Sequence, residues 1–337
     1  MRELISKLVE TFGPSGSEEQ VRNVIRAEVE SLADEIRVDA LGNLIVLKRG
    51  ANERQDGESK AIVLDAHMDE IGVMATYVDE KGFARFTGIG GIRVLNCIGG
   101  RVAFADGTVG VIGVEEKRKD TSKVPQLEQL YLDVGATSRD DCPIDVGDPA
   151  VFVRPFTCVE GAQATRLIAK AMDDRIGCAV LIETLRQLEH TSHNFYFVFS
   201  AQEEVGLRGA RTSSYGIDPD LAIAVDVTRT GDAPEDHPMA VKLGAGPAIK
   251  VKDRGMIAHQ KVRDLLIRGA KKTDIPYQLE VLRRGTTDAA AMQLVRSGVP
   301  SGCLSIPCRY VHSPSEMVDE ADVENSVQLL LNVLQIV

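Results

Sequence analysis

Five short segments of this sequence carry acids and histidines at the point where an apolar run ends. The first is VLDAHMDEIG at 63–72, in which His67, Asp69 and Glu70 follow a short run typical of a buried strand. Such strands seldom end on these side chains unless the following loop carries chemistry. The other four are AMDDRIG at 171–177, FSAQEEVG at 199–206, AVDVT at 224–228 and RYVHSPSE at 309–316. Because open α/β sheets collect their functional groups at strand ends, we expect these segments to meet in the fold.

Each segment taken alone also has a purely structural interpretation. Asp173 or Asp174 at a helix start is most simply an N-cap, and His312 is most simply a loop histidine with satisfied ring nitrogens. Glu203 and Glu204 by themselves form a solvated loop. Asp226 is harder to explain in this way, since a carboxylate inside the apolar run LAIAVDV needs a partner or a metal ion.

Together the five segments predict a hydrolytic metal centre. Imidazole nitrogens and carboxylate oxygens suit zinc, cobalt or manganese, and the set contains no thiolate. Two metal ions that share one bridging carboxylate need about five protein ligands, with water completing the shell. The residues that supply this number are His67, Asp173, Glu204, Asp226 and His312.

Composition narrows the class of protein. With 337 residues, 44% of them hydrophobic and 26% charged, the chain is typical of a soluble globular protein with a substantial core. The net charge of −11 argues against a nucleic-acid surface, because phosphate binding needs a positive footprint. No apolar run reaches membrane-spanning length, and the N-terminus has an amphipathic helix pattern instead of a signal-peptide pattern. The six cysteines contain no C-x-x-C pair, so we expect reduced thiols and a cytoplasmic location.

The elements that position the five segments alternate between helices and apolar strands. The pattern predicts a helix at 4–12, a second that begins at Ser17 with a capping box, and a third at 174–188. Strands predicted around 62–64, 194–200, 221–227 and 303–307 are apolar on both faces, as in a central sheet covered by helices. From about residue 71 the sequence pattern changes to short runs typical of β-strands, separated by residues typical of turns. We therefore expect an α/β domain with a mixed central sheet flanked by helices, formed by 1–70 and 162–337, and an inserted small all-β, barrel-like domain at 71–161.

At this point the chain resembles family forty-two of the metallopeptidases, the dinuclear-metal aminopeptidases that form tetrahedral dodecamers and include glutamyl, leucyl and deblocking enzymes. The resemblance rests on motifs that follow the family's order along nearly the whole chain: TFGPSGSEE at 11–19, AHMDEIG at 66–72, AMDDRIG at 171–177, SAQEEVGLRGA at 200–210, AVDVT at 224–228 and RYVHSPSE at 309–316. One position departs from the family pattern, since Thr286 stands in RRGTTDAAAMQ where many members have glycine.

The resemblance implies a role for each site residue. His67 and Asp226 are similar to the ligands of one metal ion, Glu204 and His312 to those of the other, and Asp173 to the bridging carboxylate. Glu203 is similar to the general base that takes a proton from water and passes it to the leaving amine. Asp69 is similar to the acid that orients His67 and fixes its tautomer.

The resemblance also implies a zinc-exopeptidase-like fold, two divalent ions per subunit (zinc or cobalt), short peptide substrates, and self-association through the inserted β domain into dimers and a dodecamer. The apolar, mildly acidic character of the chain favours a neutral aliphatic N-terminal residue over an acidic one. No nucleic-acid or membrane partner is expected.

Two other classes of function compete with this interpretation. The first is an endo-1,4-β-glucanase, because some relatives carry such names. Glycoside hydrolysis uses two carboxylates and usually aromatic sugar platforms, yet this chain has no Trp and 4% aromatic residues. The second is a metal-binding scaffold without activity, which would have no use for an unligated base such as Glu203.

Overall fold

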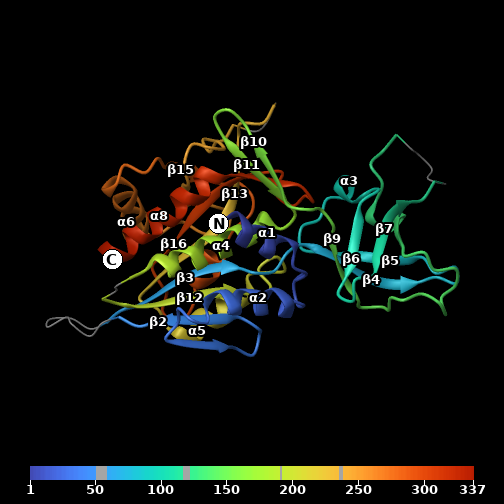
Figure 1. Ribbon diagram of the computed structural model, residues 1–337, viewed down its shortest axis with the longest axis horizontal. Helices are drawn as coiled ribbons and strands as arrows, with labels where there is room; N and C mark the ends of the chain where they lie inside the picture. The colour runs from blue at the N-terminus through green and yellow to red at the C-terminus, as the bar shows by residue number, and fades with distance from the viewer. Residues whose placement is uncertain (51–58, 117–121, 190–191, 235–237) are drawn as a thin grey trace.

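The computed structural model describes residues 1–50, 59–116, 122–189, 192–234 and 238–337. It contains one large mixed sheet and one closed barrel (Figure 1). The predicted fold class, a mixed sheet flanked by helices with an inserted small barrel, is confirmed. None of the described helices combines the length and the apolar character that a membrane crossing requires.

The large sheet has eleven strands, nine of which follow the order β1-β2-β12-β3-β13-β16-β17-β11-β10. Its four central strands are parallel: β12 (Asn194–Ser200), β3 (Ala61–His67), β13 (Leu221–Arg229) and β16 (Ser301–Arg309). The flanking strands are antiparallel to their neighbours along this path: β1 (Glu35–Val38), β2 (Leu44–Lys48), β17 (Glu316–Asp319), β11 (Thr165–Ala169) and β10 (Thr157–Glu160). β14 (Ala248–Lys252) pairs with β16 and with β15 (Gln278–Val281).

Helices cover both faces of this sheet. One face packs against α1 (Arg2–Glu10), α2 (Glu19–Val29), α4 (Met172–Gln187), α6 (Gln260–Lys272) and α8 (Glu320–Ile336). The other face packs against α5 (Arg208–Ile217) and α7 (Ala289–Met292). Since side chains alternate along a strand, Ile62 and Leu64 enter the first core and Val63 enters the second.

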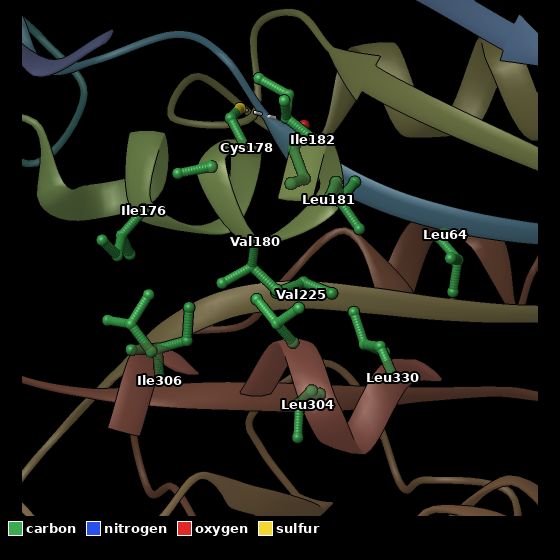
Figure 2. Close-up of a cluster of buried hydrophobic side chains, with 14 of the residues drawn as sticks. Leu64, Ile176, Cys178, Val180, Leu181, Ile182, Val225, Leu304, Ile306 and Leu330 are labelled. Carbon is green, nitrogen blue, oxygen red and sulfur yellow. Dashed lines mark hydrogen bonds between the residues drawn. The ribbon is translucent and has the colours of Figure 1, made fainter. Parts of the chain in front are cut away.

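The main core lies between α4 and the central strands. Figure 2 shows Val180 of α4 directed at Val225 of β13, with Leu304 and Ile306 of β16 beyond; Leu181 belongs to the same core. All these side chains are fully or almost fully buried, and each contributes about 1.5–3 kcal/mol through its removal from water. This packing fixes the first turn of α4 above the strand ends, which is where the acids of AMDDRIG lie.

The barrel closes in the order β4-β5-β8-β7-β6-β9 and lies at one end of the molecule (Figure 1). Its strands are β4 (Gly72–Val78), β5 (Ala84–Ile89), β6 (Arg101–Phe104), β7 (Val109–Val114), β8 (Leu130–Asp133) and β9 (Pro149–Phe152). Two short helices join it, α3 (Val94–Cys97) and the 3₁₀ helix η1 (Leu127–Gln129). The domain boundaries at 70 and 161 stay a prediction; the strand at 157–160 pairs with β11 in the large sheet and not with the barrel.

Two local expectations can be compared with the structure. The helix expected from Ser17 begins instead at Glu19, with Glu18 at the cap position, so the predicted capping box is wrong. The Glu18 carboxylate accepts hydrogen bonds from the backbone N–H of Gly16 at 2.7 Å and of Gln202 at 3.2 Å, which ties the start of α2 to the loop after β12. All six cysteines are free thiols.

Candidate metal centre

The five acid and histidine segments meet at the carboxyl ends of the central parallel strands. His67 is the last residue of β3 and lies beside Ser200, the last residue of β12. Glu203 and Glu204 follow β12, while Asp226 lies within β13. Because neighbouring parallel strands end at the same edge, these side chains gather there, and this is where α/β sheets place their chemistry.

Asp173 lies between the two histidines. Its Oδ1 is 3.0 Å from Nε2 of His67, and its Oδ2 is 3.4 Å from Nε2 of His312. The Oε2 atom of Glu204 lies 3.3 Å from the same His312 nitrogen. One carboxylate thus offers one oxygen to each of two nitrogen donors, an arrangement suited to bridging two cations.

Among the described residues, two groups of potential ligand atoms lie close enough together to hold an ion. One consists of His67, Asp173 and Glu204, and the other of His67, Asp174 and Asp226; within each group the donor atoms lie within 4.8 Å of one another. His312 joins the first group through its contacts with Asp173 and Glu204. All five predicted ligands therefore converge, and Asp174 is an additional acid that the sequence did not single out as a ligand.

Buried polar atoms without partners support a cation at this place. Oε1 of Glu204 and Oδ2 of Asp174 are both buried and accept no hydrogen bond from the described residues. Native structures satisfy almost all such atoms, so an oxygen left over in a cluster of acids fits a ligand position. The other oxygen of Asp174 accepts a hydrogen bond from the backbone N–H of Gly177 at 3.1 Å, so the N-cap interpretation holds for this one atom.

The pKa values of the clustered acids show which of their negative charges lack a compensating positive charge within the chain. Burial raises the pKa of Asp226 to about 8, with the nearby Asp173 as the next cause. Burial likewise raises the pKa of Asp174 well above its ordinary value, and Asp226 adds to this. For Asp173 the burial cost is outweighed by hydrogen bonds from His312 and His67, which lower its pKa. Bound cations would favour the ionised form of every one of these groups.

Asp69 lies behind His67 and is fully buried. Nδ1 of His67 is 3.1 Å from the main-chain oxygen of Asp69 and 3.5 Å from its Oδ1. The carboxylate also accepts hydrogen bonds from the Ser15 hydroxyl at 2.5 Å and from the backbone N–H groups of Glu203 and Glu204 at 3.0 and 3.2 Å. Asp69 therefore holds both a histidine ligand and the loop that carries the two glutamates.

Glu203 and Glu204 reach different atoms because the chain turns around them. Gln202 has a φ of +60° and Gly206 a φ of +123°, and the N–H of Gly206 bonds back to the Glu203 carbonyl at 2.8 Å. Glu204 faces His312, while Oε2 of Glu203 lies 4.0 Å from Nε2 of His67. Burial raises the pKa of Glu203 well above its ordinary value; the charge of His67 opposes this shift.

Two further buried acids support the site from outside the ligand set. Glu316 accepts hydrogen bonds from the backbone N–H of Asp173 at 2.9 Å and of His312 at 2.7 Å, so it links the bridging acid to the second histidine. Glu70 accepts two hydrogen bonds from the Lys170 ammonium, at 2.6 and 2.7 Å. Both acids lie inside the quoted motifs, but Asp173 and Lys170, their partners in other segments, are distant in sequence, so the sequence did not indicate these contacts.

Thr286, the departure from the family pattern, forms its hydrogen bond outside the predicted ligand set. Its hydroxyl donates to Oδ1 of Asp253 at 3.2 Å, and the Cα of Gly255 approaches so closely that an added Cβ there would lie 2.5 Å from the threonine oxygen. The threonine therefore joins two loops next to α7.

This arrangement of a helix-covered sheet, a cluster of acids and histidines at its strand ends and an inserted barrel defines an aminopeptidase-type hydrolase. The family model described as M42 glutamyl aminopeptidase matches residues 42–329, and the chain belongs to this family.

Similar proteins agree with this assignment. The chain is 48% identical over 336 residues to a protein of Acetivibrio thermocellus named as a candidate aminopeptidase, covering 99% of this chain and 98% of that one. It superposes with a TM-score of 0.93 on the aminopeptidase APDkam598 of the archaeon Desulfurococcus kamchatkensis, at 40% identity, covering 99% and 94% of the two chains. A second similar structure is the Pyrococcus horikoshii TET1 peptidase, which can assemble into a tetrahedron or a large octahedral shell (TM-score 0.84, 31% identity, 98% of each chain).

Proposed function

We propose that this protein is a metal-dependent aminopeptidase that removes N-terminal residues from short peptides with two divalent ions, zinc or cobalt, per subunit. The observation that carries the proposal is the position of Asp173, whose two oxygens face Nε2 of His67 and Nε2 of His312. In this proposal His67 and Asp226 would hold one ion, Glu204 and His312 would hold the other, and Asp173 would serve both. Zinc and cobalt both suit this donor set.

When bound, the two ions polarise the scissile carbonyl and lower the pKa of water. Glu203 then supplies the proton transfer. Its carboxylate takes a proton from the attacking water and delivers it to the nitrogen of the leaving peptide. The buried position of Glu203 suits this task, because a raised pKa brings the carboxylate closer to the range in which it can both accept and release a proton. Asp69 holds His67 and the Glu203 backbone in fixed positions relative to each other for this step.

The free α-amine of the substrate explains why cleavage is confined to the N-terminus. An ammonium or amine is attracted by the surplus of carboxylates in the site, whereas an acetylated N-terminus has lost that charge. We propose a neutral aliphatic residue at this position, following the apolar and mildly acidic character of the chain.

The experiment uses metal-stripped protein, a panel of aminoacyl anilides and dipeptides with leucyl, lysyl and glutamyl N-termini, and zinc, cobalt or manganese added back. The expected result is activity restored by metal, fastest on the leucyl substrates and absent on N-acetylated ones. Equal cleavage of blocked and free peptides would contradict the exopeptidase proposal. Faster cleavage of glutamyl or lysyl substrates would contradict only the aliphatic preference.

The glucanase alternative has less support in the site than the peptidase. Its mechanism needs two carboxylates and no metal ion, whereas these carboxylates surround two histidines at 3.0–3.4 Å. The scaffold alternative leaves Glu203 without a role. A chelator-resistant activity on β-1,4-glucans would support the glucanase. A Glu203→Gln variant as active as the wild type would support the scaffold.

We also propose that the chain self-associates through the inserted barrel into dimers and, from these, a dodecamer, in a cytoplasmic setting. The similarity to a TET1 peptidase that can assemble into a tetrahedron or a large octahedral shell supports self-association. Light scattering on the metal-loaded protein should give a mass near twelve chains, and a monomer mass would contradict the proposal.

A further inference from the structure

The loop between β5 and α3 of the barrel reaches the second histidine of the site. The carbonyl oxygen of Gly91 lies 3.1 Å from Nδ1 of His312. A carbonyl only accepts hydrogen bonds, so Nδ1 carries a proton, and in the neutral ring Nε2 then has the lone pair that can bind a cation. In addition, the Asn96 amide donates to the main-chain oxygen of His312 at 3.4 Å.

The approach of this loop to the site is very close. A Cβ atom added at Gly91 would lie 2.6 Å from Nδ1 and 2.9 Å from Cε1 of His312. One added at Gly90 would lie 3.0 Å from Oε2 of Glu204, and Gly90 also has a φ of +71° that other residues rarely adopt. The two glycines thus lie against two of the proposed ligands, Glu204 and His312.

The loop is anchored in the barrel and not in the large sheet. Ile92 and Val94 pack against the barrel core, and Cys97 is fully buried within it. The position of the Gly91 carbonyl is therefore set by the packing of the inserted module.

The other histidine shows the same chemistry with a different source of the carbonyl. Nδ1 of His67 also lies 3.1 Å from a main-chain oxygen, but this one belongs to Asp69, two residues along the same loop. Both histidines thus present Nε2 to Asp173 while a carbonyl faces Nδ1. For His67 the large domain provides the carbonyl, and for His312 the barrel provides it.

We propose that Gly91 is a positioning residue for the second metal ion, and that the inserted barrel completes the catalytic site of its own chain in addition to any role in self-association. The inference rests on the proposed two-metal site and deepens it. Gly91 acts through His312, by fixing the ring orientation and the tautomer that leaves Nε2 free to bind the ion.

The test is a titration of metal-stripped protein with Co²⁺ alone. Calorimetry and the absorption of the bound Co²⁺ monitor the titration. Wild type should bind two ions per chain. Gly91→Ala, which pushes a methyl group against the ring, should bind one ion as wild type does and the other at least about tenfold more weakly. Ile92→Ala, which loosens the loop without touching a ligand, should weaken the same ion to a smaller degree.

Two controls separate this role from general loss of structure. Val102→Ala opens a cavity in the barrel core at a residue that is fully buried in β6, and Gly216→Ala adds a methyl group where no atom lies within 4 Å. Both should bind two Co²⁺ ions with wild-type affinity, although the Tm of Val102→Ala falls.

The outcomes distinguish the inference from the function on which it rests. Unchanged binding of both ions by Gly91→Ala overturns the inference and leaves the two-metal site intact. Weakening by Val102→Ala as large as that by Ile92→Ala also overturns it, because any loosening of the barrel would then suffice. A wild-type protein that binds fewer than two Co²⁺ ions contradicts the two-metal site itself.

Discussion

Oδ1 of Asp69 accepts a hydrogen bond from the backbone N–H of Glu203 at 3.0 Å. The acid that faces His67 therefore also holds the residue proposed as the base. Together with the bond from the Glu204 N–H to Oδ2 at 3.2 Å, it joins the loop after β3 to the loop after β12. The position of the base relative to the first histidine is thus set by one fully buried carboxylate.

Asp69→Asn should damage the site more than the loss of one charge suggests. The new amide group points two N–H donors at positions where backbone N–H groups and the Ser15 hydroxyl already donate. We expect metal affinity to fall about 10–100-fold, with a parallel loss of kcat. Metal content after dialysis and steady-state kinetics measure the two effects.

Ser15→Ala is the matched control for this change, since it removes one of the donors to Asp69 and leaves the carboxylate in place. Its loss of metal affinity should be smaller than that of Asp69→Asn. An Asp69→Asn protein with wild-type metal content and kcat would show that the carboxylate does not organise the site.

Glu203→Gln should separate proton transfer from metal binding. The amide has nearly the same shape but accepts no proton from water, so kcat should fall by about 10²–10⁴. Both ions should still bind, because Glu203 is not among the proposed ligands. Inductively coupled plasma analysis of the purified variant checks this. Loss of an ion together with activity would instead identify Glu203 as a ligand.

Lys170→Met should destabilise the whole protein. Lys170 and Glu70 are both almost completely buried, and the ammonium donates to both Glu70 oxygens at 2.7 and 2.6 Å. Removing the lysine leaves a buried carboxylate, whose only remaining cation among the described residues is Arg175 with Nη2 at 3.4 Å. Such a loss costs about 3–5 kcal/mol of unfolding free energy, and we expect the lower end because Arg175 remains.

Chemical denaturation measures this change. The double variant with Glu70→Gln and Lys170→Met is the control, since it removes the carboxylate together with the ammonium. Arg175 then keeps only its hydrogen bonds to backbone carbonyls, so the double variant should regain part of the lost stability. Equal stability of Lys170→Met and wild type would show that the pair is not buried in solution.

The pair of Asp232 and Arg309 should make stability depend on pH. Burial opposes the charge of Asp232, but hydrogen bonds from Arg309 and Thr230 lower its pKa to about 2. A folded-state pKa below the unfolded value means that the stabilisation is complete above about pH 4 and disappears as pH falls toward 2. Because the side chains of Arg309 and Asp232 are 26% and 18% exposed, solvent screening reduces the expected stabilisation to about 1 kcal/mol.

Asp232→Asn is therefore expected to be less stable than wild type by about 1 kcal/mol at pH 6 and equally stable near pH 2. Urea unfolding at the two pH values measures the difference. A gap between the two proteins that persists at low pH would assign the effect to something other than the ionised carboxylate.

The convergence of the five segments was predictable because each follows an apolar run, and strand ends of parallel sheets meet at one edge. Asp226 carried its own signal, an acid among buried apolar neighbours. The role of Asp174 was hidden, since an aspartate at a helix start satisfies the N-cap rule, and one of its oxygens does bond to Gly177. Only the three-dimensional arrangement shows that the other oxygen faces the site.

Contacts between distant segments account for what the sequence could not show. Ser15 lies in a quoted motif, but nothing in its surroundings pointed to Asp69, 54 positions away. The capping-box prediction at Ser17 failed because Glu18 binds the Gln202 backbone instead, a tertiary contact that outweighs a local preference. Gly91 contacts His312 through its main-chain carbonyl oxygen. Every residue has such an oxygen, so the residue type does not indicate this contact.

The strand order of the large sheet has a consequence for how the protein acquires its structure. β3 pairs in parallel with β12 and β13, so Ala61 meets Asn194 and Ile62 meets Leu221, and β13 in turn needs β16 at Ser301. Each pairing must close a long loop, and the entropy cost of this closure comes before the stabilising contacts form. Folding is therefore slow, and apolar strand edges stay uncovered in the meantime. The site is completed only when His312 arrives beyond β16, so an unfinished or misfolded chain carries no assembled peptidase centre.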